Sequence, residues 1–171
     1  MKNIFYFLLA IVFLTGCSKD DGPVKEDVGL IRVPGVTVTI DPTSDKTISA
    51  VNPAAFKGKV NVDLVFPNEK PQSVDVVVMK NKNPADVKVI QAGVTSFPTT
   101  VEITGQQLTT LFGQPITAGQ NFTVGATINV ASGQTINAFP LAGAVAYGAG
   151  ANNVITNLKP GITTQVLFSV P

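Results

Sequence analysis

The sequence contains no histidine, no tryptophan and a single cysteine among its 171 residues. Without histidine there is no imidazole to act as a general base, to activate a serine or cysteine nucleophile, or to bind a metal. A single cysteine excludes an intramolecular disulfide and a cysteine-rich zinc site. These absences argue against an enzyme, and we expect no catalytic residues, no cofactor and no metal site.

Charge is also scarce. The 12 basic and 11 acidic residues give a formal net charge of only +1. Nucleic-acid binding needs clustered positive charge to neutralise phosphates, so we expect no nucleic-acid partner. Within residues 103–171 the only charged residue is Lys159. This neutral stretch is typical of the surface of an exported β-domain, and the alternative is a surface that packs against a partner or a neutral glycan.

The N-terminus has the pattern of a bacterial lipoprotein signal. Lys2 supplies a positive charge, and the apolar run at residues 4–14 is shorter than the roughly 20 residues of a transmembrane helix but suits a secretory signal. The letters LTGC, which end at Cys17, resemble a lipobox, whose cysteine becomes the mature N-terminus and carries the lipid. We predict a signal peptide at residues 1–16 and lipidation of Cys17, which anchors the protein to a membrane. An ordinary signal peptide with an incidental cysteine, or a short hydrophobic anchor, is the alternative.

The residues after the cysteine indicate a destination. They are Ser18, Lys19, Asp20 and Asp21. A lysine followed by two acidic residues resembles the surface-export signal of Bacteroidetes lipoproteins, and the alternative is a generic charged tether. We therefore expect an outer-membrane, lipid-anchored protein that faces the cell exterior. Residues 17–32 are rich in charge and contain glycine and proline, so they are predicted to form a flexible tether.

Apolar and polar residues alternate along most of the remaining chain. The clearest alternation is at residues 122–130, and the other segments are 36–40, 60–66, 74–78, 87–89, 101–103 and 166–170. An alternation of period two predicts half-buried strands. Turn signals separate them at residues 67–68, 81–84, 93 and 132–133. The pattern predicts an all-β fold at residues 33–171, a single antiparallel sandwich of the immunoglobulin or fibronectin-III type.

One short helix interrupts the strands at residues 105–112. Thr104 and Gln107 have the spacing of a capping box, and Gly113 is a helix-terminating glycine. The apolar residues of this segment fall on one helical face: Leu108, Leu111 and Phe112. A binding helix would be longer and more polar, so we predict that this one closes an end of the sandwich.

Pairs of carboxylates are the remaining candidates for acid–base chemistry or metal binding. Asp63 and Asp75 have outward positions on strands that we expect to be neighbours, so they could face each other as a glycosidase pair does. Outward aspartates more often lie on a solvated face, and three lysines favour surface ion pairs: Lys59, Lys80 and Lys88. Asp41 and Asp45 flank a turn and could bind Ca²⁺, but Ca²⁺ needs about six to eight oxygen ligands, and an Asx-type turn is the simpler interpretation.

Sugars commonly stack on exposed aromatic rings. Three phenylalanines have core-facing positions in the predicted strands: Phe66, Phe122 and Phe168. Tyr147 instead lies in an alanine- and glycine-rich segment, residues 140–153, together with Asn152 and Asn153. If the protein binds a glycan, we predict that these three residues contact it, and the alternative is a packing or interface role for Tyr147.

One stretch resembles the N-terminal immunoglobulin-like domains of SusE/SusF-type lipoproteins of Bacteroidetes. It consists of the strand FPTTVEIT, the helix GQQLTTLFG, the segment ITAGQ and the strand at residues 121–130. Such proteins are accessory components of glycan capture beside outer-membrane importers. The resemblance implies a non-catalytic accessory or binding module of a glycan or nutrient uptake system, with an importer, another surface protein or a polysaccharide as partner. The alternative is a structural or adhesive surface lipoprotein that binds a partner protein and no glycan.

Overall fold

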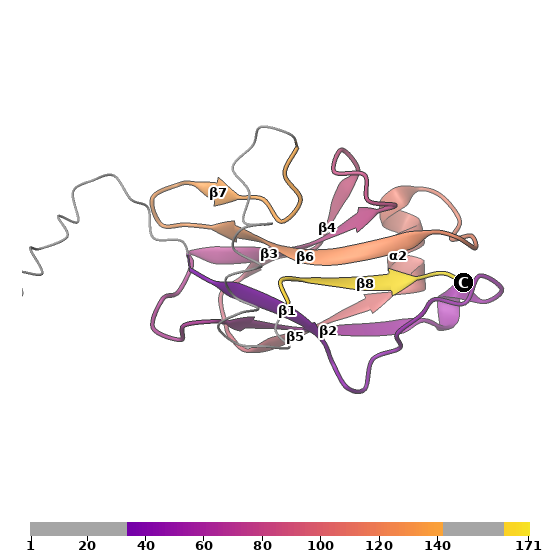
Figure 1. The fold of residues 1–171 in the computed structure, drawn as a ribbon, viewed down its shortest axis with the longest axis horizontal. Coiled ribbons are helices and arrows are strands. Elements are labelled where there is room, and N and C mark those ends of the chain that lie inside the picture. The colour runs from indigo at the N-terminus through magenta and orange to yellow at the C-terminus, as the bar shows by residue number, and fades with distance from the viewer. Residues whose placement is uncertain (1–33, 142–162) are drawn as a thin grey trace, which may run out of the picture. The chain divides into compact units, whose positions relative to one another are not determined.

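A computed structural model describes residues 34–141 and 163–171 (Figure 1). Residues Val33–Pro171 form one compact unit. The strands are arranged in two antiparallel sheets with a shared core, so the predicted all-β sandwich is confirmed. Several of the predicted site residues lie outside the described ranges: Cys17, Ser18, Lys19, Asp20, Asp21, Tyr147, Asn152 and Asn153.

The chain passes back and forth between the two sheets. The three-stranded sheet has the order β1 (Val36–Ile40), β2 (Lys57–Leu64) and β5 (Thr99–Thr104). The five-stranded sheet runs β4 (Val87–Val94), β3 (Ser73–Lys80), β6 (Asn121–Asn129), with β7 (Thr135–Ile136) and β8 (Gln165–Ser169) both paired to β6. The chain crosses between sheets after β2, after β4 and after β5. This is the Greek-key connectivity of immunoglobulin-like sandwiches.

The core consists of the inward rows of the alternating strands. Val62 of β2, Val76 of β3 and Val124 of β6 are fully buried. The residue before each of them in the strand, Asn61, Asp75 and Thr123 in turn, faces outward. The rings of Phe56 and Phe168 meet edge to face, with centroids 5.2 Å apart. Burial of each such side chain stabilises the fold by about 1.5–3 kcal/mol, and this drives the two sheets together.

Phe66 does not belong to the core, which corrects one prediction. Its side chain is 52% exposed. The alternation predicted a strand through residue 66, but β2 ends at Leu64 and Phe66 lies in the turn that follows. Beyond the end of a strand, successive side chains no longer alternate between two faces, so the inward position of Leu64 says nothing about Phe66.

The predicted turn at Gly93 is also wrong. Gly93 lies inside β4 and has a φ of 68°, which glycine adopts at little steric cost. Its N–H donates to the Asp75 carboxylate at 2.8 Å, beside a shift in the register between β3 and β4. The glycine therefore forms an irregularity in an edge strand, which makes that edge a poorer template for pairing with another chain. The two-residue strand β7 was too short to be predicted.

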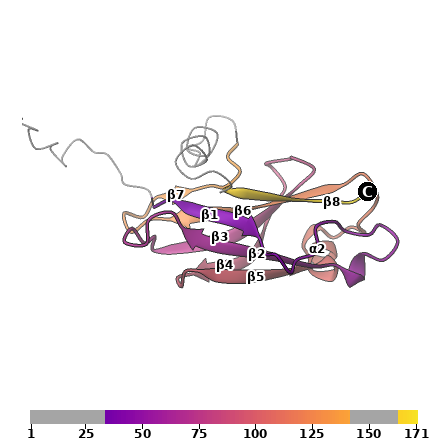
Figure 2. The ribbon, with the colours of Figure 1, turned by 60° about the horizontal axis from the view of Figure 1, so that its bottom comes forward.

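Helix α2 (Gly105–Phe112) begins and ends where the sequence predicts. The Thr104 hydroxyl accepts a hydrogen bond from the Gln107 N–H at 3.1 Å, and Gly113 ends the helix with a φ of 63°. Leu108 is buried in the core, and the side chains of Leu111 and Phe112 pack against it. Both views show α2 at the end of the sandwich where the C-terminus lies (Figures 1 and 2). The helix therefore closes this end.

Hydrogen bonds join the two sheets along one side of the sandwich. Val38 of β1 donates its N–H to the Thr163 carbonyl at 2.9 Å, and the Thr163 hydroxyl donates to the Val38 carbonyl at 2.9 Å. Ile48 likewise donates its N–H to Ser169 of β8 at 2.9 Å. Among the described strands, β4 and β5 lie at open edges of the two sheets, and the two-residue strand β7 also ends its sheet.

Gly105 gives a direct test of how α2 is seated. In an isolated helix alanine is about 1 kcal/mol more favourable than glycine. Here a Cβ on Gly105 would overlap the Pro53 carbonyl of the short 3-10 helix η1 (Pro53–Ala55). Because such overpacking costs about 1–3 kcal/mol, we expect Gly105→Ala to lower the free energy of unfolding in urea denaturation. Gln106→Ala, one residue further along the helix, is the control and should change stability little; a stabilised Gly105→Ala variant would contradict this packing.

Candidate functional site

Asp63 and Asp75 do not form a pair. Asp63 lies on β2 in the three-stranded sheet and Asp75 on β3 in the five-stranded sheet. Each follows a buried valine of the shared core, so the two carboxylates face opposite sides of the sandwich. The prediction that they are neighbours is wrong because β2 and β3 are consecutive in the chain but belong to different sheets. These two residues therefore cannot act together as the acid and base of a glycosidase.

Asp41 and Asp45 have structural partners. Asp41 Oδ1 accepts hydrogen bonds from the Thr43 N–H at 2.8 Å and the Thr43 hydroxyl at 2.6 Å, which is the Asx-type turn. Asp45 Oδ2 accepts from the Lys57 N–H at 2.8 Å. Within residues 34–141 and 163–171, no three acidic, histidine or cysteine side chains are grouped as metal ligands. The two aspartates thus stabilise the turn after β1 and the first residue of β2.

A network that was not predicted crosses the three-stranded sheet. We call Asp41, Asn61 and Thr100 the Asn61 network. The Asn61 amide donates to Asp41 Oδ2 at 3.0 Å, and the Thr100 hydroxyl donates to Asn61 Oδ1 at 2.7 Å. Asn61 of β2 pairs directly with Thr100 of β5, and Asp41 follows the last residue of β1. The network therefore connects all three strands across the outer face of the sheet.

Hydrogen bonding keeps the Asp41 carboxylate ionised. The Thr43 hydroxyl and then the Thr43 N–H lower the pKa of Asp41 below its ordinary value of 3.8, the Asn61 amide adds to this, and Lys59 contributes a weaker attraction. Each donor stabilises the charged form of the carboxyl group more than the neutral form. At neutral pH the network thus presents a negative charge whose position is determined by its partners.

A network of the same type lies on the opposite face. The Asn129 amide donates to Asp75 Oδ2 at 3.1 Å, and the Thr135 hydroxyl donates to Asn129 Oδ1 at 3.0 Å. We call these three residues the Asn129 network. It connects β3, β6 and β7, and its order of donors and acceptors equals that of the Asn61 network. Such networks therefore have a structural role.

A groove lies on the outer face of the three-stranded sheet. It has a volume of about 640 Å³, and all three members of the Asn61 network line it. Other lining residues come from the same three strands and the turn before β5: Thr37, Thr39, Asp63, Pro98 and Thr99. The groove presents hydroxyl, amide and carboxylate groups side by side. Its chemistry suits a ligand that both donates and accepts hydrogen bonds.

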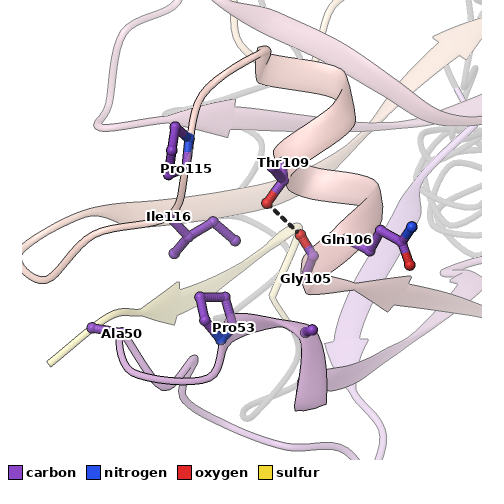
Figure 3. A pocket seen from close by; sticks show the side chains of 8 residues that line it. Ala50, Pro53, Gly105, Gln106, Thr109, Pro115 and Ile116 are labelled. Carbon is purple, nitrogen blue, oxygen red and sulfur yellow. Dashed lines mark hydrogen bonds between the residues drawn. The ribbon is translucent and has the colours of Figure 1, made fainter.

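A second hollow, of about 440 Å³, lies where α2 meets η1 (Figure 3). Pro53 and Ile116 contribute apolar surface, and Gln106 and Thr109 project from the helix. The Thr109 hydroxyl donates to the Gly105 carbonyl at 3.0 Å, so this donor is used within the helix. The hollow therefore offers mainly apolar contacts and few free hydrogen-bonding groups to a ligand.

Within the described residues, no ion pair joins Lys59, Lys80 or Lys88 to Asp63 or Asp75. Lys59 lies 3.6 Å from Glu102, and Lys88 lies 3.2 Å from Asp86. These are partly exposed contacts, which contribute little to stability.

Lys80 is buried instead of being a surface partner. Only 7% of Lys80 is exposed. Its ammonium donates to Gln114 at 3.1 Å and lies 5.7 Å from the centroid of the Phe112 ring. The carbonyl end of a helix and the face of an aromatic ring both favour a cation, so Lys80 stabilises the end of α2. Its inward position does follow the alternation of β3.

Residues 1–18 match the family described as the prokaryotic membrane lipoprotein lipid attachment site. The matched segment contains Cys17, the only cysteine in the chain. The protein is a membrane-anchored lipoprotein. No curated protein matches the chain. Among the described residues, no helix has the length and apolar character to cross a membrane.

The anchor of the lipoprotein can be tested at its cysteine. We expect Cys17→Ser to abolish incorporation of a labelled fatty acid and to release the protein from the membrane fraction, because each buried CH₂ of an acyl chain contributes about 0.8 kcal/mol to anchoring. Ser18→Ala leaves the thiol in place and should still incorporate the label. A Cys17→Ser protein that retains the fatty acid would contradict lipidation at this residue.

The Asn61 network makes stability depend on pH. Since the folded pKa of Asp41 is below its ordinary value, its contribution is present above about pH 3.8 and is lost as the pH falls through the folded pKa. Asp41→Asn removes the charge that accepts the hydrogen bond from the Asn61 amide, so the variant should be less stable than the unchanged protein at pH 7. Because the variant has no carboxyl group to titrate at this position, its stability should also fall less between pH 7 and pH 3. Urea denaturation at pH 7 and pH 3 measures both effects. The control is Glu102→Gln on the same sheet, which should keep the pH dependence of the unchanged protein. If the unchanged protein, Asp41→Asn and Glu102→Gln all had the same pH dependence of stability, Asp41 would not be its source.

Proposed function

We propose that this lipoprotein is a non-catalytic outer-membrane protein that faces the cell exterior and acts as an accessory or binding module of a glycan or nutrient uptake system. The observation that carries the proposal is the polar groove on the three-stranded sheet. A lipid anchor on the same chain keeps such a groove at a membrane surface. The resemblance of residues 97–130 to SusE/SusF-type domains supports the same role.

The location follows from the residues around the lipid site. Ser18 to Asp21 have the pattern of the surface-export signal, and the chain beyond the tether is a β-sandwich. A binding module for large polymers must be outside the cell, because a polysaccharide does not cross the outer membrane before it is processed. The proposal therefore places the sandwich on the exterior face.

The non-catalytic character rests on the use of the carboxylates. Asp41, Asp45 and Asp75 accept hydrogen bonds from neighbouring strands and turns, and Asp63 accepts from the Leu64 N–H at 2.7 Å. Two carboxyl groups must lie about 5 to 9 Å apart across a bound sugar for glycoside hydrolysis. The pair proposed from the sequence faces opposite sides of the sandwich, so binding without hydrolysis is the better match.

A partner protein is the second candidate, favoured by the outer face of the five-stranded sheet. Val77, Ala138 and Phe139 form a small apolar cluster there, and the Phe139 ring lies directly over Gly125. Val89, Leu167 and Leu141 are each about half exposed. The three cluster residues are themselves buried, and the half-exposed side chains are the apolar surface that a protein partner could cover. This face supports the alternative of a structural or adhesive lipoprotein that binds a partner protein and no glycan.

Surface display and glycan binding can be measured separately. On intact cells, added protease should degrade the lipoprotein while a periplasmic marker survives. The purified lipoprotein should be retained by at least one insoluble polysaccharide of a broad panel, without release of reducing sugar.

If Tyr147 contributes as predicted, Tyr147→Ala should weaken that retention. Because Tyr6 is removed with the predicted signal peptide, this variant has no other tyrosine that could replace it. Protection from protease, or hydrolysis of the polysaccharide, would contradict the proposal; retention of none, with co-purification of a membrane protein, would favour the alternative.

A further inference from the structure

We propose that the groove on the three-stranded sheet is a binding site for neutral oligosaccharides, and that Asn61 and Thr100 are its principal hydrogen-bonding residues. This inference rests on the proposed glycan-binding function and deepens it, because it assigns a site other than Tyr147 and a class of glycan. It follows from the donors and acceptors of the Asn61 network and from the charge of the groove.

The network leaves a defined set of groups for a ligand. An asparagine amide has two N–H donors, and the contact with Asp41 uses one of them. The Thr100 hydroxyl donates its proton to Asn61, so its oxygen can accept another hydrogen bond. A donor and an acceptor therefore lie next to each other across paired strands. Neighbouring hydroxyls of a sugar can accept from the first and donate to the second.

The orientation of these groups is set before a ligand binds. Asn61 is held at both ends of its amide, by Asp41 on one side and Thr100 on the other. Asp41 is itself held by two hydrogen bonds from Thr43. A ligand that meets oriented side chains loses less affinity to side-chain ordering. This preorganisation lets a small number of polar groups select a ligand.

Charge determines which glycans fit. The Asp41 carboxylate is ionised at neutral pH and lines the groove together with the carboxylate of Asp63. Two negative groups repel uronic acids and sulfated sugars but accept hydrogen bonds from neutral hydroxyls. Pro98 adds an apolar ring at the side of the groove, against which the C–H face of a sugar can pack. The groove therefore favours neutral oligosaccharides.

The Asn129 network supplies the matched control. Its asparagine, aspartate and threonine have the same order of hydrogen-bond donors and acceptors on the opposite face of the sandwich, and the Asn129 amide also donates to the Ser73 hydroxyl at 3.1 Å. If polar networks on strands only stabilise the sheets, Asn61→Ala and Asn129→Ala should both lower stability and leave binding unchanged. A binding role for the groove makes the two variants differ.

The test is a titration of the mature lipoprotein in detergent micelles with neutral oligosaccharides and with uronic-acid oligosaccharides, followed by calorimetry and by ¹H–¹⁵N spectra. A chelator in every sample removes binding bridged by a cation. We expect neutral oligosaccharides to bind, with shifts in the Asn61 side-chain amide, and acidic ones to bind at least about tenfold more weakly. Asn61→Ala and the nearly isosteric Thr100→Val should each weaken binding about five- to tenfold, as the loss of one hydrogen bond implies. Asn129→Ala should bind as the unchanged protein does.

The outcomes separate the two proposals. Binding that survives both Asn61→Ala and Thr100→Val but is lost in Tyr147→Ala would overturn the groove and leave the glycan-binding function standing. Equal or stronger binding of acidic oligosaccharides would overturn the assigned class of glycan. Absence of binding to every oligosaccharide and polysaccharide would overturn both proposals. Thermal denaturation of each variant shows whether it is folded. If Asn61→Ala does not fold, Thr100→Val, at an exposed position, still tests whether the groove binds oligosaccharides.

Discussion

The burial of one side of β1, β2, β3, β5, β6 and β8 is the interaction on which the rest of the structure depends. Val62, Val76 and Val124 each contribute to a core shared by both sheets, and a slip of one residue would move such side chains to the surface. The register that buries them also determines which outward residues meet. Asn61 lies opposite Thr100 because Val60 lies opposite Val101 and both are buried. The polar networks are therefore consequences of how the core is packed.

This dependence explains what could be predicted from the sequence. Local periodicity was sufficient for the positions of most strands, although it failed at the end of β2, at Gly93 within β4 and for the short β7. Both ends of α2 were predicted because the capping residues of a helix lie within a few positions of one another. The pairing of Asp63 with Asp75 failed because sheet membership is set by contacts between distant segments. The Asn61 network was missed for the same reason: Asp41, Asn61 and Thr100 come from three separate segments. Their outward polar positions were visible, but their register was not.

The two outer faces of the sandwich differ in character although both contain an asparagine network. The three-stranded sheet presents hydroxyl, amide and carboxylate groups around a groove. The five-stranded sheet instead has a small buried apolar cluster, in which the Phe139 ring packs over Gly125, and the half-exposed side chains of Val89 and Leu167. Since the faces point in opposite directions, a glycan on one and a protein on the other would not compete.

A site of this kind is suited to a protein anchored by lipid. Among the residues described as lining the groove there is no aromatic ring, so it offers only the apolar surface of Pro98 beside its hydrogen bonds. If the groove binds sugars as proposed, each single contact with a sugar is therefore weak. Many copies in one membrane would then meet a polysaccharide that repeats the same sugar, and after the first contact each further contact would occur at a high effective concentration. In that proposal, lipid anchoring turns weak binding by single domains into firm retention of a polymer.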